Sequence, residues 1–244
     1  MALGRVLVVV SLMAALSGCT DDQSTRRAGG DITASASAVL RMTQPRAVHR
    51  ATLLSDGSVL VTGGCTERGC GGFDAGRRAE RYVPGRGLVA DAEMATPRAS
   101  GTATLLADGR VLLVGGYPGE GRPPTSSAEV YDPATDSFAA VGDLGTARAD
   151  HSATLLPDGQ VMVAGGFDAE GGALSTTEYF DPATGEFRPG PGLSQPRAAH
   201  VAVLAGRDLV LVGGTQTPRP SRPPTSSTST PASASVRGRP ARTS

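Results

Sequence analysis

Short apolar runs separated by turn-forming residues recur along the chain between residues 42 and 214. Residues 51–54, 103–106 and 153–156 each read Ala-Thr-Leu-Leu, and each is followed by Asp-Gly at 56–57, 108–109 or 158–159. A second apolar run comes next, at 59–62, 111–114, 161–164 and, in a fourth copy, 209–212. Asp-Gly between two apolar runs is a strong hairpin signal because the turn needs positive φ. The pattern therefore predicts one β-hairpin repeated along the chain.

Glycine pairs and arginines mark the same repeat. The pairs lie at 63–64, 115–116, 165–166 and 213–214, and the arginines at 46, 98, 148 and 197, so that both recur about every 50 residues. Glycine lacks a Cβ and permits a bulge or a close approach of two backbones. We therefore expect each pair to end its strand at a crowded position.

A third strand is predicted to end at an aromatic residue before proline, as in Tyr131-Asp132-Pro133 and Phe180-Asp181-Pro182, with Tyr82-Val83-Pro84 in the first repeat. Proline cannot donate to a strand ladder and so stops it. A bulky residue follows six or seven positions later, at Leu88, Phe138 or Phe187, in what would be an outer strand.

Glycine pair, aromatic-Asp-Pro, bulky residue and Arg together resemble the kelch motif over residues 42–214. The resemblance implies an all-β, kelch-type β-propeller in which each repeat is one four-stranded blade. The motif's usual Trp is Leu or Phe here, and Val83 replaces Asp in the first repeat. Three repeats are complete and a fourth is half present, so we expect an incomplete, open propeller of about four repeats. Its exposed blade edges would invite self-association.

Residues 215–244 change composition to Pro, Ser, Thr and Arg without aromatic residues. Such a segment buries too little to offset its ordering entropy, so the tail is predicted to be disordered. A blade-like register nevertheless persists, because Arg-Pro-Pro-Thr-Ser-Ser at 122–127 recurs at 222–227. A degenerate blade and a frame-shifted reading of one are the alternatives.

Residues 1–18 read as an export signal, with Arg5 before an apolar run at 6–16 that is too short to span a bilayer. Leu16-Ser17-Gly18-Cys19 resembles the lipobox of bacterial lipoproteins. That resemblance implies cleavage before Cys19, acylation of this cysteine and a protein that faces the periplasm or the cell surface. An ordinary secretory signal is the alternative. Residues 19–41 are expected to be a linker.

Export also bears on Cys65 and Cys70, which flank a short turn-rich segment. In an oxidising compartment we expect them to form a local disulfide. A metal site is the alternative, and it would need two further ligands.

The net charge and the recurring polar residues indicate structural roles for these residues. With five arginines in the tail and Arg5 in the signal, residues 19–214 hold 17 Arg against 23 acidic residues. This negative balance disfavours nucleic-acid binding. His49, His151 and His200 each lie three positions after a repeat arginine, and Glu80, Glu129 and Glu178 each lie two before the aromatic residue. Residues that recur with the blade are predicted to hold the blade together, with the glutamates paired to the arginines. We assign no catalytic, cofactor or metal residue.

The sequence therefore favours a non-enzymatic binding module. The segments after the glycine pairs, 66–77, 118–127 and 168–176, differ while the strands repeat, and recognition usually lies in such loops. The expected ligand is a protein or a carbohydrate, and the membrane is reached only through the lipid anchor. One alternative is a propeller enzyme of the radical-copper oxidase type, which would need two Tyr, two His and a Cys outside the repeat register. Another is a non-functional fragment of a longer kelch protein.

Overall fold

The structure is a computed structural model that describes residues 42–43, 45–65 and 75–216. The predicted signal (1–18), linker (19–41) and nearly all of the tail (215–244) lie outside the described residues. Within the described part, no helix has the length and apolar character needed to cross a membrane.

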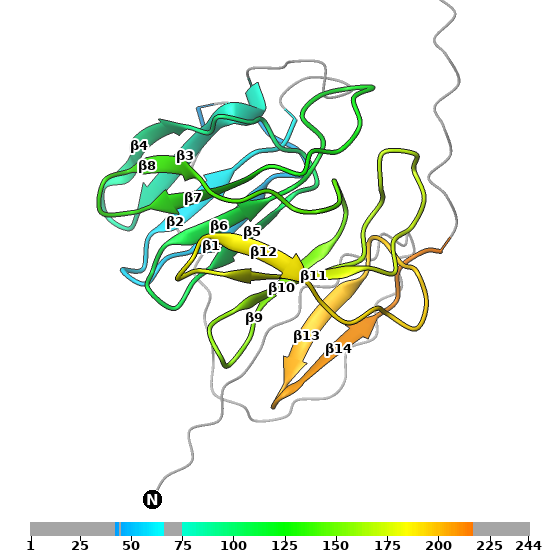
Figure 1. The fold of residues 1–244 in the computed structure, drawn as a ribbon. Coiled ribbons are helices and arrows are strands. Elements are labelled where there is room, and N and C mark those ends of the chain that lie inside the picture. The colour runs from blue at the N-terminus through cyan, green and yellow to red at the C-terminus, as the bar shows by residue number, and fades with distance from the viewer. Residues whose placement is uncertain (1–41, 44, 66–74, 217–244) are drawn as a thin grey trace, which may run out of the picture. The chain divides into compact units, whose positions relative to one another are not determined.

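The described residues form antiparallel sheets, which we call blades 1 to 4 in sequence order (Figure 1). Blade 1 consists of β1 (Arg50–Leu53), β2 (Val59–Thr62), β3 (Arg78–Val83) and β4 (Gly87–Glu93), with a short 3-10 helix at Ala75–Arg77. Blade 2 consists of β5 (Thr102–Leu105), β6 (Val111–Val114), β7 (Ala128–Asp132) and β8 (Ser137–Ala140). Blade 3 consists of β9 (Ser152–Leu155), β10 (Val161–Ala164), β11 (Thr177–Asp181) and β12 (Glu186–Pro189). Blade 4 contains β13 (Val201–Ala205) and β14 (Asp208–Val212).

The predicted hairpin turns are confirmed. Gly57, Gly109 and Gly159 have φ values of 82°, 87° and 88°, which a residue with a Cβ rarely adopts. The Leu54 N–H donates to the Ser58 carbonyl at 2.8 Å and closes the first turn. Blade 4 lacks Asp-Gly, and there Gly206, with φ 67°, begins the turn between Ala205 and Asp208.

Consecutive blades lie side by side through their first strands: β1 lies beside β5, β5 beside β9 and β9 beside β13 (Figure 1). The small Ala and Thr side chains of these strands suit positions where neighbouring blades approach each other.

The hydrophobic core lies between the blades. Leu54 and Leu60 of blade 1 pack with Val111 and Leu113 of blade 2. Leu112, Val114 and Val130 of blade 2 form a second cluster with Val161, Val163 and Phe180 of blade 3. We call the face that a blade turns to the next blade its forward face, and the other its rear face.

The outer strands contribute to the same cores. Phe138 pairs with Tyr131 across strands at a ring-centroid distance of 5.0 Å, and Phe187 pairs with Phe180 at 4.9 Å. These contacts place the bulky residue of each repeat in the fourth strand, as expected. The all-β fold and its blades are thus as predicted.

Candidate functional site

A buried arginine–glutamate pair stands at the base of each four-stranded blade. The nitrogen–oxygen distances are 3.0 Å for Arg46–Glu80, 2.9 Å for Arg98–Glu129 and 2.7 Å for Arg148–Glu178. The predicted pairing of the repeat arginines with the recurring glutamates is therefore confirmed.

Each pair also ties backbone segments together. Glu178 accepts hydrogen bonds from the backbone N–H groups of Gly145 (2.7 Å) and Thr146 (3.2 Å). Arg148 donates to the carbonyl oxygens of Gly165 (2.9 Å) and Thr176 (3.1 Å). The pair thus joins the segment that enters the blade, the glycine pair and the start of the third strand.

Electrostatics agree with this structural role. Burial would raise the pKa of Glu80, but hydrogen bonds from Thr43 and Arg46 outweigh it and lower the pKa. Burial lowers the pKa of Arg148, and the charge of Glu178 opposes that shift. The lowered pKa of Glu80 favours its charged form, which suits its pairing with Arg46.

The glycine pair is hydrogen-bonded to the segment that leads into the next blade. The N–H of its second glycine donates to the carbonyl oxygen of the following repeat arginine, at 2.8 Å for Gly64–Arg98 and 2.9 Å for Gly116–Arg148 and Gly166–Arg197. A Cβ on Gly115 would stand 2.4 Å from the Arg148 oxygen. The predicted close backbone approach is therefore confirmed.

The histidines bridge adjacent blades. Nε2 of His151 lies 3.0 Å from Oγ1 of Thr102, and Nε2 of His200 lies 2.9 Å from Oγ of Ser152. Burial, followed by the positive charge of Arg148, holds the pKa of His151 well below its usual range. These histidines serve the scaffold. In the described part of the chain, no group of three His, Cys, Asp or Glu residues is placed to hold a metal ion.

Blade 2 has a glycine at the position where the other blades have a histidine. Gly101 occupies that position, and Arg50 of blade 1 donates from Nε to the Gly101 carbonyl oxygen at 2.6 Å. A cavity of about 10 Å³ remains beside Arg50 and Gly101, which is about the space that one water needs.

A left-handed residue recurs two positions after each repeat arginine. Val48, Ser100, Asp150 and Ala199 have φ values of 50°, 55°, 53° and 54°. The Asp150 N–H donates to the Ser100 carbonyl at 2.9 Å, and the Ala199 N–H donates to the Asp150 carbonyl at 2.8 Å. These turns link consecutive blades beside their innermost strands. The residue types gave no sign of this conformation.

Two of the three predicted recognition loops lie in the described part, and they share one anchoring contact. Thr125 donates its N–H to the carbonyl of Gly116 at 2.9 Å, and Leu174 donates to that of Gly166 at 2.8 Å. Both loops are thus anchored to the second glycine of the pair. Most of the third loop, at 66–74, lies outside the described residues.

Beyond that anchor the two loops differ. Residues 120–123 are exposed and read Glu-Gly-Arg-Pro, whereas in the other loop Ala169 and Glu170 are exposed. The Asp168 carboxylate accepts from the N–H groups of Glu170 (3.1 Å) and Gly172 (2.7 Å), which fixes the second loop in a tight turn.

Of the three cysteines with a predicted role, Cys65 lies in the described part of the chain. Cys65 is disulfide-bonded. Its predicted partner Cys70 and the predicted lipidation site Cys19 lie outside the described residues, so the pairing and the anchor stay predictions.

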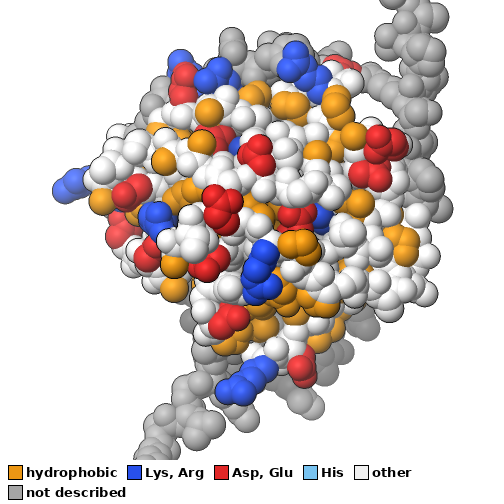
Figure 2. All heavy atoms as spheres, viewed as in Figure 1, with side chains coloured by type: hydrophobic (Ala, Val, Ile, Leu, Met, Phe, Trp, Pro, Cys, Tyr) orange, Lys and Arg blue, Asp and Glu red, His pale blue; other side chains and the backbone are white. Residues whose placement is uncertain are grey.

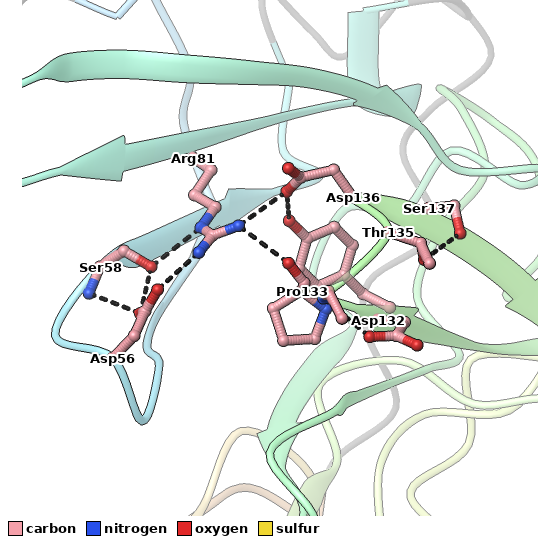
Figure 3. A network of polar contacts seen from close by, with 10 residues as sticks. Asp56, Ser58, Arg81, Asp132, Pro133, Thr135, Asp136 and Ser137 are labelled. Carbon is pink, nitrogen blue, oxygen red and sulfur yellow. Dashed lines mark hydrogen bonds and ion pairs between the residues drawn. The ribbon is translucent and has the colours of Figure 1, made fainter.

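The opposite ends of the blades carry a bridge that the sequence did not reveal (Figure 3). Arg81 of blade 1 pairs with Asp56 of its own blade and donates to the Pro133 carbonyl and the Asp136 carboxylate of blade 2, both at 3.0 Å. Hydrogen bonds from Ser58 lower the pKa of Asp56 to about 2; burial opposes this shift, and Arg81 adds to it. The bridge fixes the first two blades to each other.

An open groove of about 540 Å³ lies at the same ends, between blades 2 and 3. Its polar lining includes Asp108, Arg110, Asp158, Gln160 and Asp181. Asp108 pairs with Arg110, while Asp158 and Asp181 accept backbone N–H groups of their own turns. These carboxylates are committed to local structure.

Comparison with known proteins agrees with this architecture. The Kelch motif model matches residues 98–145 and 148–194, which span blades 2 and 3. Blades 2 and 3 carry the kelch motif. A solved structure described as the structure of YjhT is similar, with a TM-score of 0.57 at 16% sequence identity. The match covers 70% of this chain and 58% of that one, so the kelch blades described here span little more than half of that protein. No curated protein matches the sequence.

Proposed function

We propose that this kelch-type propeller is a non-enzymatic binding module, exported and anchored through a lipid on Cys19. Its loops at 118–127 and 168–176, together with the loop at 66–77, bind a protein or carbohydrate ligand outside the cytoplasm.

The contrast between scaffold and loops supports this proposal. The repeated polar residues are engaged inside the blades: Arg148 with Glu178, and His151 with Thr102. The loops start from the same contact with the glycine pair, yet expose different side chains. A rigid, repeated base that carries variable loops is how repeat proteins build a recognition surface.

Among the exposed charges of the two loops, we take Arg122 and Glu170 as the candidate contact residues. They stand on separate blades, so a ligand that touches both must extend across the boundary between blades 2 and 3. Such a ligand fits an extended oligosaccharide or a protein surface.

A binding screen with the full-length chain tests the proposal. The immobilised protein would be probed with an array of oligosaccharides and, in parallel, with cell-surface proteins. We expect one class to bind, and we expect Arg122→Glu and Glu170→Arg each to weaken that binding at least about tenfold, which corresponds to a loss of about 1.4 kcal/mol.

Arg207→Glu is the matched control, because Arg207 is exposed in the β13–β14 turn, away from these loops. It should leave binding unchanged. Binding that survives both loop substitutions would contradict the assigned surface, and failure of the unmodified chain to bind either class would contradict the function.

The radical-copper oxidase alternative gains no support from the described residues. His151 and His200 are each engaged with a hydroxyl of the preceding blade, and both lie in the repeat register. The binding module accounts for these contacts and remains the proposal.

A further inference from the structure

Blade 4 exposes a face made of four valines. Val201 pairs with Val212 across β13 and β14, and Val203 pairs with Val210. Their exposed fractions are 54%, 59%, 37% and 43% in that order. Figure 2 shows hydrophobic side chains gathered over the part of the surface where Figure 1 places β13 and β14.

The corresponding positions in other blades form forward faces, and those faces are covered. Thr102, Thr104, Leu112 and Val114 occupy them in blade 2, and blade 3 follows the same pattern with Ser152, Thr154, Met162 and Ala164. Leu112, Val114 and Ala164 are each 0% exposed. Blade 4 thus presents a forward face, and it is the blade in which both polar inner positions have become valine.

Blade 1 presents a matching rear face. Ala51 and Leu53 are exposed, Leu53 to 65%, and Val59 and Val61 are half-buried. The equivalent residues of blade 2, Val111 and Leu113, are 0% and 1% exposed because blade 1 covers them. The rear face of blade 1 has the same kind of residues without that cover.

We propose that two copies of this chain associate head to tail, with the forward face of blade 4 in one copy packed on the rear face of blade 1 in the other. The interface between blades already joins blade 1 to 2, 2 to 3 and 3 to 4 in this way. The proposed contact continues that established interface with the same classes of side chain.

Polar groups at the junction complete the fit. Gly64, Gly116 and Gly166 each donate an N–H to the next repeat arginine's carbonyl. Within the described part of the chain, Gly214 lacks that acceptor and the Arg46 carbonyl lacks that donor. A second copy brings these two groups together. His49 would meet Val201 in place of a hydroxyl, so the new junction relies more on apolar contact than the internal ones do.

Symmetry limits the assembly. A head-to-tail contact builds a ring when its rotation closes. The smallest assembly with one such contact is a dimer, which leaves one forward face and one rear face free for further copies.

The mass of the full-length chain in solution tests this inference, by light scattering on a sizing column over a range of concentrations. We expect a mass of at least two chains that rises with concentration. Val203→Asp on the forward face and Leu53→Asp on the rear face should each raise the dissociation constant of this association at least about 100-fold, because each puts an unpaired charge into an apolar contact. Both side chains are exposed in one copy, so folding should survive, and circular dichroism checks this.

Mixing the two variants gives the sharper result. Val203→Asp keeps an intact rear face and Leu53→Asp keeps an intact forward face, so the mixture should recover a 1:1 dimer. Val89→Asp is the matched control, because Val89 is a 48% exposed valine on the outermost strand of blade 1, and it should dimerise normally.

Three outcomes would overturn the inference. A chain that stays monomeric at every concentration would mean that these faces are covered within one molecule or left bare. Dimers that tolerate both aspartates would place the interface elsewhere. Variants that dissociate alone and fail to recover when mixed would contradict the pairing of a forward face with a rear face.

Discussion

Gly116 donates its backbone N–H to the carbonyl oxygen of Arg148, 2.9 Å away, and so joins the second blade to the third. The residue before it, Gly115, must also lack a side chain. A Cβ there would stand 2.4 Å from the Arg148 oxygen and 2.9 Å from Cε1 of His151. The glycine pair is therefore the place where one repeat is fitted to the next.

Gly115→Ala should lower the free energy of unfolding by at least about 3 kcal/mol, because it adds an overlap with backbone to an unfavourable positive φ. Gly159→Ala is the control: its φ is 88°, but a Cβ there meets nothing within 4 Å. That variant should lose only about 1–2 kcal/mol. Urea unfolding measures the free energy of unfolding of both variants. Equal losses would contradict the close backbone approach at Gly115.

Glu178→Ala should be among the most damaging single substitutions. It leaves Arg148 buried without its counter-ion, which typically costs about 3–5 kcal/mol. Glu93→Ala removes the exposed pair with Arg78 and should cost less than about 1 kcal/mol. If thermal or urea unfolding shows similar losses for the two variants, the buried pair does not hold the blade.

Stability should fall as the pH drops below about 6.5. Burial lowers the folded-state pKa of His151 and His200, so below the unfolded-state pKa of about 6.5 the unfolded chain binds protons that the folded chain does not. Each histidine contributes up to about 1.4 kcal/mol per pH unit. Urea unfolding between pH 5.5 and 7.5 measures the slope, and His151→Gln should reduce it. An unchanged slope in that variant would rule out this cause.

Lipid attachment is predicted at Cys19. Labelling cells with an acyl-chain analogue should tag the full-length protein, and Cys19→Ser should lose both the label and membrane fractionation. Cys65→Ser is the control, because it should keep the label. A Cys19→Ser protein that still pellets with membranes would contradict the anchor.

Cys65 and Cys70 are predicted to pair with each other. Peptide mapping of exported protein under non-reducing conditions should yield one cross-linked peptide that contains both, since Cys65 is disulfide-bonded. A cross-link from Cys65 to Cys19, or recovery of two alkylatable thiols, would show that the local pairing is wrong.

The strands and the arginine–glutamate pairs followed from the sequence because they recur at fixed offsets. The equivalents of Arg148 and Glu178 recur at a similar spacing in every complete repeat. This repetition distinguished them from single charged residues. The Arg81 bridge was not predictable in this way, because Arg81 does not recur: its position holds Val130 in blade 2 and Tyr179 in blade 3. The left-handed turn was also missed, since Val48 is β-branched and gives no hint of positive φ.

Every complete repeat carries one forward face and one rear face, and so encodes half of two different interfaces. A gene that duplicates or loses one unit of about 50 residues would therefore change the number of blades while every new junction still joins a forward face to a rear face. Selection can then lengthen or shorten such a protein in whole blades, while the loops after the glycine pairs diverge independently.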